Sequence, residues 1–121
     1  FPIEIENHIG DRVGGPSAGL MFALGMYDQL TPGPLTGGMK VAGTGSIESS
    51  GLVGNVGGIA QKMAGAERSG ASVFLVPAGN CGEFLQARKF DMTVVKVADL
   101  DDAIRAIDSL SKNPKAKVPS C

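Results

Sequence analysis

The five residues Val73–Pro77 carry only apolar side chains, and this run restricts the possible folds more than any other segment of the chain. A strand without polar positions is typical of a sheet that is covered on both faces, because neither face of the strand meets water. The run therefore predicts a buried strand in a layered α/β domain.

Hydrophobic periodicity and turn residues supply the other elements. The predicted order is a strand at 2–6, a helix at 16–30, a hairpin of glycine-broken strands at 40–47 and 52–56, a helix at 59–69, the strand at 73–77, a short helix at 81–88, a strand at 93–97 and a helix at 99–110. The helix at 16–30 is apolar nearly all round, which predicts packing on several sides. Gly70 and Asp99 fit a helix C-cap and N-cap. The expected fold class is α/β, one domain with mixed short strands and about four helices.

Length and composition indicate one globular domain. The chain has 121 residues, 43% of them hydrophobic and 19% charged, which fits a single core and not a disordered segment. We expect the domain to occupy residues 1–111 and a tail to occupy residues 112–121. The net charge of −1 is too balanced for nucleic-acid binding, and no apolar run is long enough to span a membrane. Because the sequence opens at Phe1 without Met, we expect it to be part of a longer chain.

Few metal-binding side chains are present. One His and two Cys cannot supply a zinc site of the usual Cys/His spacing. We therefore expect no metal and no cofactor.

The string Gly15-Pro16-Ser17-Ala18-Gly19 matches a nucleophile pattern in which glycines clear the approach to a serine. A serine near a helix start is more often a cap, so the string alone is weak evidence. Its position adds weight, because the N–H groups of Ser17 and Ala18 would lie in a first helical turn without helical partners. Such donors form a natural oxyanion site.

A nucleophilic serine needs a base, and the chain offers two candidates. His8 precedes Ser17, which is the reverse of the α/β-hydrolase order. Lys62 lies on the same helical stripe as Ile59, Met63 and Ala66. A lysine there either extends its ammonium from the stripe margin into water or is desolvated, and desolvation favours the neutral amine that can act as a base.

Both motifs together resemble the proteolytic domain of Lon-type proteases. The resemblance rests on Gly14-Gly15-Pro16-Ser17-Ala18-Gly19 and on Lys62 in Gly57-Gly58-Ile59-Ala60-Gln61-Lys62. It implies Ser17 as nucleophile, Lys62 as general base and Thr44 as a hydroxyl that positions the lysine amine. Peptide hydrolysis through an acyl-enzyme follows from these roles.

Two positions depart from the Lon pattern. Gly15 stands where an aspartate is usual, and Ser46 stands where a glutamate is usual, so the support of the dyad differs. No P-loop is present, so we expect activity that does not depend on ATP in this chain.

Several phrases, Val76-Pro77-Ala78-Gly79-Asn80-Cys81 among them, resemble bacterial membrane-anchored proteins that join a PDZ domain to a Lon-like domain outside the cytoplasm. This resemblance implies a PDZ domain and an anchor beyond the present sequence, and it allows an oligomer. An oxidising compartment would also permit a Cys81–Cys121 bridge, which would stabilise the fold by roughly 4 kcal/mol.

Two other functions remain open. In one, the fold is kept but the dyad is idle, and the domain only binds a peptide or a partner protein. In the other, His8 is the base of an esterase. Arg68 and Asp11 either touch substrate or are merely solvated.

Overall fold

The structure is a computed structural model, and it describes residues 18–30 and 36–121. The predicted strand at 2–6 and the beginning of the predicted helix at 16–30 lie outside this part of the chain. The described elements are α1 (Gly19–Leu30), β1 (Val41–Gly43), β2 (Ser46–Ile47), β3 (Val53–Gly54), α2 (Ile59–Arg68), β4 (Val73–Pro77), the 3₁₀ turn η3 (Ala78–Asn80), α3 (Cys81–Gln86), β5 (Thr93–Val97) and α4 (Leu100–Lys112). This mixed α/β arrangement confirms the predicted fold class.

A three-stranded parallel sheet forms the centre of the domain, in the order β1-β4-β5. Val73 of β4 pairs with Val41 on one side and with Thr93 on the other. All five residues of β4 are buried, which confirms the strand predicted from its apolar run. Its side chains alternate between two cores, because successive residues of a strand point to opposite faces.

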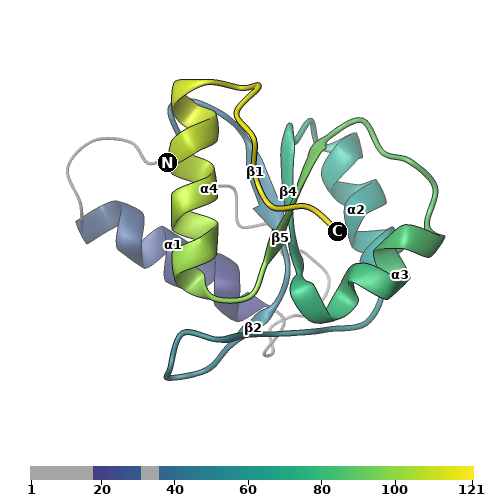
Figure 1. The fold of residues 1–121 in the computed structure, drawn as a ribbon, viewed down its shortest axis with the longest axis horizontal. Helices are drawn as coiled ribbons and strands as arrows, with labels where there is room; N and C mark the ends of the chain where they lie inside the picture. The colour runs from purple at the N-terminus through teal and green to yellow at the C-terminus, as the bar shows by residue number, and fades with distance from the viewer. Residues whose placement is uncertain (1–17, 31–35) are drawn as a thin grey trace.

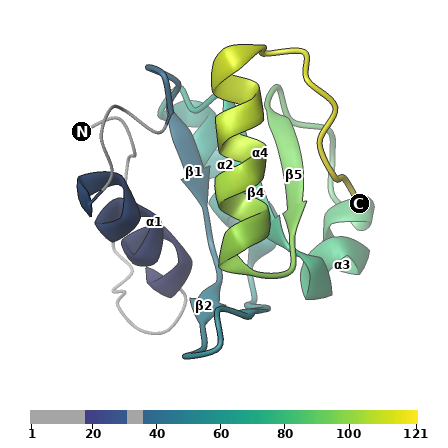
Figure 2. The same cartoon turned by 60° about the vertical axis from the view of Figure 1, so that its left-hand side comes forward.

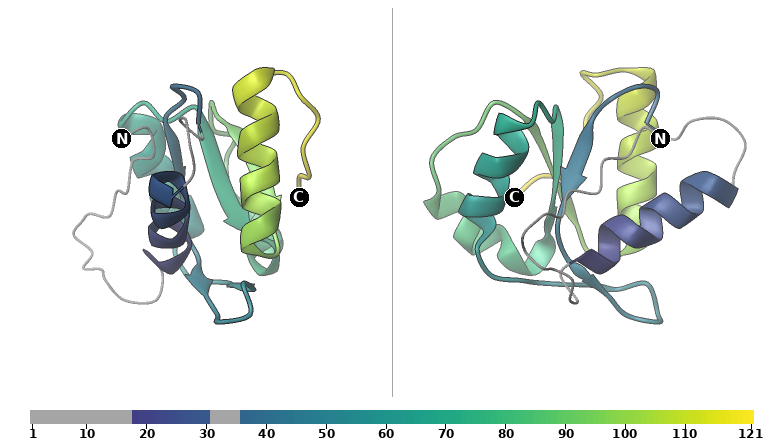
Figure 3. Two further views of the ribbon diagram at one scale, coloured as in Figure 1. Left: turned by 90° about the vertical axis from the view of Figure 1, so that its left-hand side faces the viewer. Right: turned by 180° about the vertical axis from the view of Figure 1, so that it is seen from behind.

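Helices cover both faces of the sheet (Figure 1). One core joins α1 and α4 to the sheet through Leu24, Ile107, Val73 and Leu75. The other joins α2 to the sheet through Ile59, Met63, Phe74 and Val76. In Figure 2 and in the left panel of Figure 3, α4 lies over the side of the sheet that carries β5, and α1 lies toward β1.

The predicted hairpin at 40–56 is wrong in its first half. Val41–Gly43 pairs in parallel with β4, and only Ser46–Ile47 pairs antiparallel with β3. Gly45 has φ 144°, a conformation that side-chain-bearing residues rarely adopt, and it separates the two short strands. Beyond the break, the predicted turn is present, since Gly51 N–H donates to the Glu48 carbonyl at 2.8 Å.

Helix α1 was predicted to be packed on several sides, and the structure leaves part of its apolar surface exposed. Phe22 and Met26 are 52% and 64% exposed. The buried face is Leu20, Met21 and Leu24, which meets the sheet and α4. An apolar composition all round the helix was therefore insufficient to predict how many sides are covered.

Local signals predicted the ends of two other helices. Gly70 has φ 90°, and the N–H groups of Gly70 and Ala71 donate to the carbonyls of Glu67 and Ala66, which is a Schellman ending for α2. The Asp99 side chain accepts from Asp102 N–H at 2.8 Å and caps α4. Both predicted caps are confirmed.

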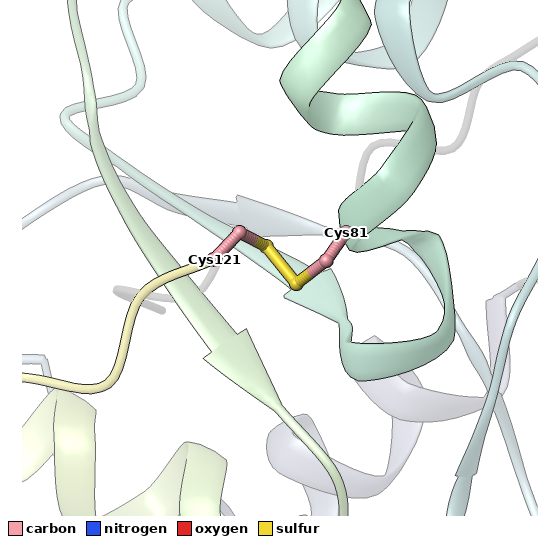
Figure 4. Close-up of a disulfide and its surroundings, with 2 residues drawn as sticks. All are labelled: Cys81 and Cys121. Carbon is pink, nitrogen blue, oxygen red and sulfur yellow. A yellow bond between two sulfur atoms is a disulfide. The ribbon is translucent and has the colours of Figure 1, made fainter.

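The segment after α4 returns along β5 toward α3. Lys96 N–H donates to the Pro119 carbonyl at 2.9 Å, and Ala116 and Val118 pack on the core shared with α4. Cys121 then forms a disulfide with Cys81 at the first residue of α3, with Cα atoms 5.3 Å apart (Figure 4). Among residues 18–30 and 36–121, no helix has the length and apolar character needed to traverse a bilayer.

Candidate active site

The start of α1 is fixed against the residue that follows Thr44. Leu20 N–H donates to the Gly45 carbonyl at 2.9 Å, and a Cβ atom added at Gly19 would lie 3.0 Å from Ile47. Figure 1 shows this purple end of α1 beside β2. Ser17 lies outside the described residues, and Ala18, the first described residue, directly precedes the helix.

Thr44 is a buried polar residue at the carboxyl end of β1, with 3% of its surface exposed. Its N–H donates to the Leu75 carbonyl at 3.4 Å, which extends the pairing with β4 by one residue. Side chains two apart along a strand share a face. Thr44 therefore lies on the side of the sheet where Ala42 packs with Ile59 and Met63 of α2.

Helix α2 begins at this same edge of the sheet. Val56, three residues before α2, is hydrogen-bonded to Asn80, which lies just beyond the carboxyl end of β4. At the other end of α2, Ser72 N–H donates to the Lys40 carbonyl at 2.9 Å, at the amino end of β1. The helix therefore runs antiparallel to the strands, with its first turn at their carboxyl edge.

Lys62 lies in the second turn of α2 and is exposed. Its backbone N–H donates to the Gly58 carbonyl at 3.0 Å, and its Nζ lies 3.9 Å from where a Cβ of Gly58 would be. The residues predicted to share its stripe, Ile59, Met63 and Ala66, are buried, which confirms the stripe. The desolvated lysine that we considered is not observed, because the side chain lies over the glycine N-cap instead of entering the core.

Three predicted parts therefore converge at the carboxyl edge of the sheet: the start of α1, Thr44 and the start of α2. This edge is where open α/β sheets generally bind ligands. Backbone N–H groups at the start of α1 are suited to stabilise a developing oxyanion. Lys62, in the second turn of α2, is a lysine near this same edge.

The other predicted residues are placed as follows. Ser46 pairs with Gly54 between β2 and β3, and a Cβ atom added at Gly54 would lie only 2.3 Å from the Ser46 hydroxyl oxygen. Arg68 is exposed in the last turn of α2, about 9 Å along the helix from Lys62. His8, Asp11 and Gly15 lie outside the described residues.

Two residues near this edge were missed by sequence reasoning. Asn80, 5% exposed, and Glu83 both hydrogen-bond the segment that leads into α2. The available signal was a pair of polar residues three positions apart, directly after the apolar run of β4. A spacing of three residues puts Asn80 and Glu83 on one side of a short helix. The neighbouring sequence does not indicate that their partners are Val56 and Ile59.

The opposite edge of the sheet, at the amino ends of β4 and β5, carries an open hollow. The hollow has a volume of about 580 Å³ and is lined by residues that include Glu67, Ser72, Phe90 and Asp91. Glu67 accepts hydrogen bonds from Asp91 N–H at 2.7 Å and from the Arg88 guanidinium at 3.0 Å. These bonds, the one from Asp91 first, lower the pKa of Glu67 below its ordinary value.

Within the described part of the chain, no group of three or more His, Cys, Asp or Glu is placed to hold a metal ion.

Known proteins match most of the chain. Residues 10–108 match the family model of the Lon protease (S16) C-terminal proteolytic domain. A "Lon protease" of Anaeromyxobacter dehalogenans (strain 2CP-C) is 35% identical over 109 residues, which are 87% of this chain and 12% of that protein. "Lon protease 2" of Herpetosiphon aurantiacus is 33% identical over 108 residues, which are 84% of this chain and 13% of that protein.

The structure is thus an α/β domain in which the start of α1, Thr44 and the start of α2 lie at the carboxyl edge of one parallel sheet. The chain belongs to the Lon protease (S16) C-terminal proteolytic domain family. It spans about an eighth of the length of these curated relatives.

Proposed function

We propose that this domain is a serine endopeptidase with a Ser17–Lys62 dyad. The observation that carries the proposal is the convergence of the start of α1, Thr44 and the start of α2 at one edge of the sheet. Membership of the Lon proteolytic family supports the reaction class.

In the proposed first step, the neutral amine of Lys62 takes the proton of the Ser17 hydroxyl. The serine oxygen attacks the carbonyl carbon of the peptide bond, and the electron pair of the carbonyl moves to its oxygen. The N–H groups of Ser17 and Ala18 at the start of α1 stabilise this oxyanion. The Lys62 ammonium then returns its proton to the leaving amine, and an acyl-enzyme remains.

In the second step, Lys62 takes a proton from water, and the resulting hydroxide attacks the ester. Collapse of the second tetrahedral species returns the proton to Ser17 and releases the carboxylic acid product. The Thr44 hydroxyl positions the lysine amine in both steps. No step uses a metal, a cofactor or ATP.

Substrates are proposed to be extended polypeptides held beside an exposed strand, where main-chain hydrogen bonds give affinity. The first experiment measures cleavage of an unfolded, fluorescently labelled polypeptide without nucleotide. Ser17→Ala and Lys62→Ala are each expected to remove activity, and Lys89→Ala, at an exposed lysine after α3, is the matched control. Addition of ATP is expected to leave the rate unchanged.

A catalytically idle Lon-like module that binds a peptide or a partner protein is the alternative. The Gly15 and Ser46 departures favour it. Under this alternative, Ser17→Ala and Lys62→Ala leave every measured activity unchanged while peptide binding persists. An esterase with His8 as base instead requires that His8→Ala abolishes turnover and that Lys62→Ala does not.

We also propose an extracytoplasmic location, with the domain joined to a PDZ domain and a membrane anchor in the longer protein. The Cys81–Cys121 disulfide supports this location, since disulfides persist in oxidising compartments. Fractionation of cells that express the full-length protein tests it. Recovery in the cytosol with both thiols free would contradict the proposal.

A further inference from the structure

Asn80 is a buried amide that binds both backbone groups of one distant residue. Its Oδ1 accepts from Val56 N–H at 2.9 Å, and its Nδ2 donates to the Val56 carbonyl. An amide side chain offers a donor and an acceptor side by side, as these two bonds require. Asn80 therefore satisfies both backbone groups of Val56, and it fixes the segment three residues before α2.

Glu83 supplies the cap that α2 lacks in its own sequence. The N-cap residue is Gly58, with φ 71° and no side chain, and the first turn of α2 contains no acidic residue. Glu83 Oε2 accepts from Ile59 N–H at 3.1 Å, and Oε1 accepts from Asn80 Nδ2 at 3.3 Å. A carboxylate at a helix N-terminus also interacts favourably with the helix dipole. One side chain thus joins the first residue of α2 to the Asn80 amide.

Close packing reinforces this pair. A Cβ atom added at Gly79 would lie 3.1 Å from the Asn55 side chain, so the turn after β4 sits directly on the segment before α2. The polar contacts of Asn80 and Glu83 both cross 24 residues of sequence. These contacts fix the backbone of residues 56–59 to the residues that follow the carboxyl end of β4.

Lys62 is placed by this segment. Its N–H donates to the Gly58 carbonyl at 3.0 Å, and its Nζ lies over Gly58. A shift of the Val56–Ile59 backbone would therefore move the Lys62 amine with it. We infer that Asn80 and Glu83 are positioning residues that fix the Lys62 amine at the start of α2 for catalysis. This inference rests on the proposed Ser17–Lys62 dyad.

The test measures kcat and KM of cleavage separately in the disulfide-bonded protein. Asn80→Asp keeps the shape and the acceptor for Val56 N–H, but it replaces the donor with an oxygen facing the Val56 carbonyl and Glu83. Glu83→Ala removes the cap, and Glu83→Gln keeps one acceptor for Ile59 N–H. Gln86→Ala, at an exposed position of the same helix, is the matched control.

Asn80→Asp and Glu83→Ala are expected to lower kcat by about 10-fold to 100-fold, because misplacing a catalytic group costs that much in rate. KM is expected to stay within about twofold, since the inference assigns both residues to the position of Lys62 and not to substrate binding. Glu83→Gln should recover most of the lost kcat, and Gln86→Ala should behave as the wild type. A purely structural role predicts a smaller active fraction with unchanged kcat per active site, so active sites are titrated in each variant.

Amide hydrogen exchange gives a second readout that does not depend on catalysis. Glu83→Ala should speed exchange at Ile59 and Lys62, but it should leave exchange unchanged at Val76 and Val95, which are buried in the sheet. Faster exchange at the start of α2 without any loss of kcat would overturn the inference while leaving the dyad intact. Activity that survives Lys62→Ala would instead overturn the proposed function, and the inference with it.

Discussion

Leu20 and Gly45 are joined by a backbone hydrogen bond of 2.9 Å, from the N–H of the first turn of α1 to the carbonyl that follows Thr44. This bond ties the helix that begins just after Ser17 to the end of the first strand of the parallel sheet. The position of the start of α1 relative to Thr44 therefore depends on the backbone conformation of Gly45.

Gly45→Ala is expected to destabilise the domain by about 1–3 kcal/mol, because the residue has a positive φ that alanine rarely adopts. The added methyl would also lie 2.7 Å from a Val53 side-chain carbon. Urea unfolding followed by circular dichroism measures the change. Gly57→Ala is the control, since a Cβ there meets nothing within 4 Å, and its stability should change by less than about 0.5 kcal/mol.

Thr44→Val is expected to lower kcat by about 10-fold or more, because it removes the hydroxyl proposed to position the Lys62 amine while keeping the side-chain shape. Thr44→Ser should retain most of the activity. Steady-state cleavage of an unfolded polypeptide provides the measurement, with Thr93→Val, at an exposed strand position, as the control. Full activity in Thr44→Val would show that the Thr44 hydroxyl does not position the Lys62 amine.

Removal of the Cys81–Cys121 disulfide is expected to cost up to about 4 kcal/mol of stability, because the bond closes a loop with a sequence separation of 40. The unreduced, unfolded protein should contain no titratable thiol, and the reduced protein should contain both. Cys121→Ser and Ser120→Ala are compared by urea unfolding. Two free thiols in the unreduced protein would contradict the bond.

Glu67→Gln is expected to lower stability at neutral pH, and the deficit should shrink in acid. The hydrogen bonds from Asp91 N–H and Arg88 lower the folded-state pKa of Glu67, so the unfolded chain binds its proton first as the pH falls. The stabilisation is therefore present above the ordinary glutamate pKa of about 4.3 and is lost as the pH falls through the lower folded value.

Urea unfolding of wild type and Glu67→Gln from pH 7 to pH 3 measures this difference. Glu48→Gln, on the exposed turn between β2 and β3, is the control for the substitution itself. A deficit in Glu67→Gln that stays constant down to pH 3 would mean that the carboxylate charge is not what stabilises this contact.

Local patterns predicted the elements whose signals lie within a few residues. The apolar run of β4, the buried stripe of Ile59, Met63 and Ala66, and the caps at Gly70 and Asp99 are all as expected. Such features depend on side-chain periodicity and on the conformational preferences of single residues, and both can be read from the sequence. The two-motif pattern around Ser17 and Lys62 likewise indicated the family without a structure.

The pairing of β1 with β4, the exposed side of α1 and the contacts of Asn80 and Glu83 were decided by the tertiary structure. Val41 pairs with Val73, and Asn80 binds Val56, across 32 and 24 residues of sequence. The sequence around one residue of each pair does not identify its partner. The free energy of these long-range contacts comes from burial that exists only once the helices and the sheet have assembled. The sequence by itself therefore determined the elements and the family, and the assembled sheet decided which residues surround Lys62.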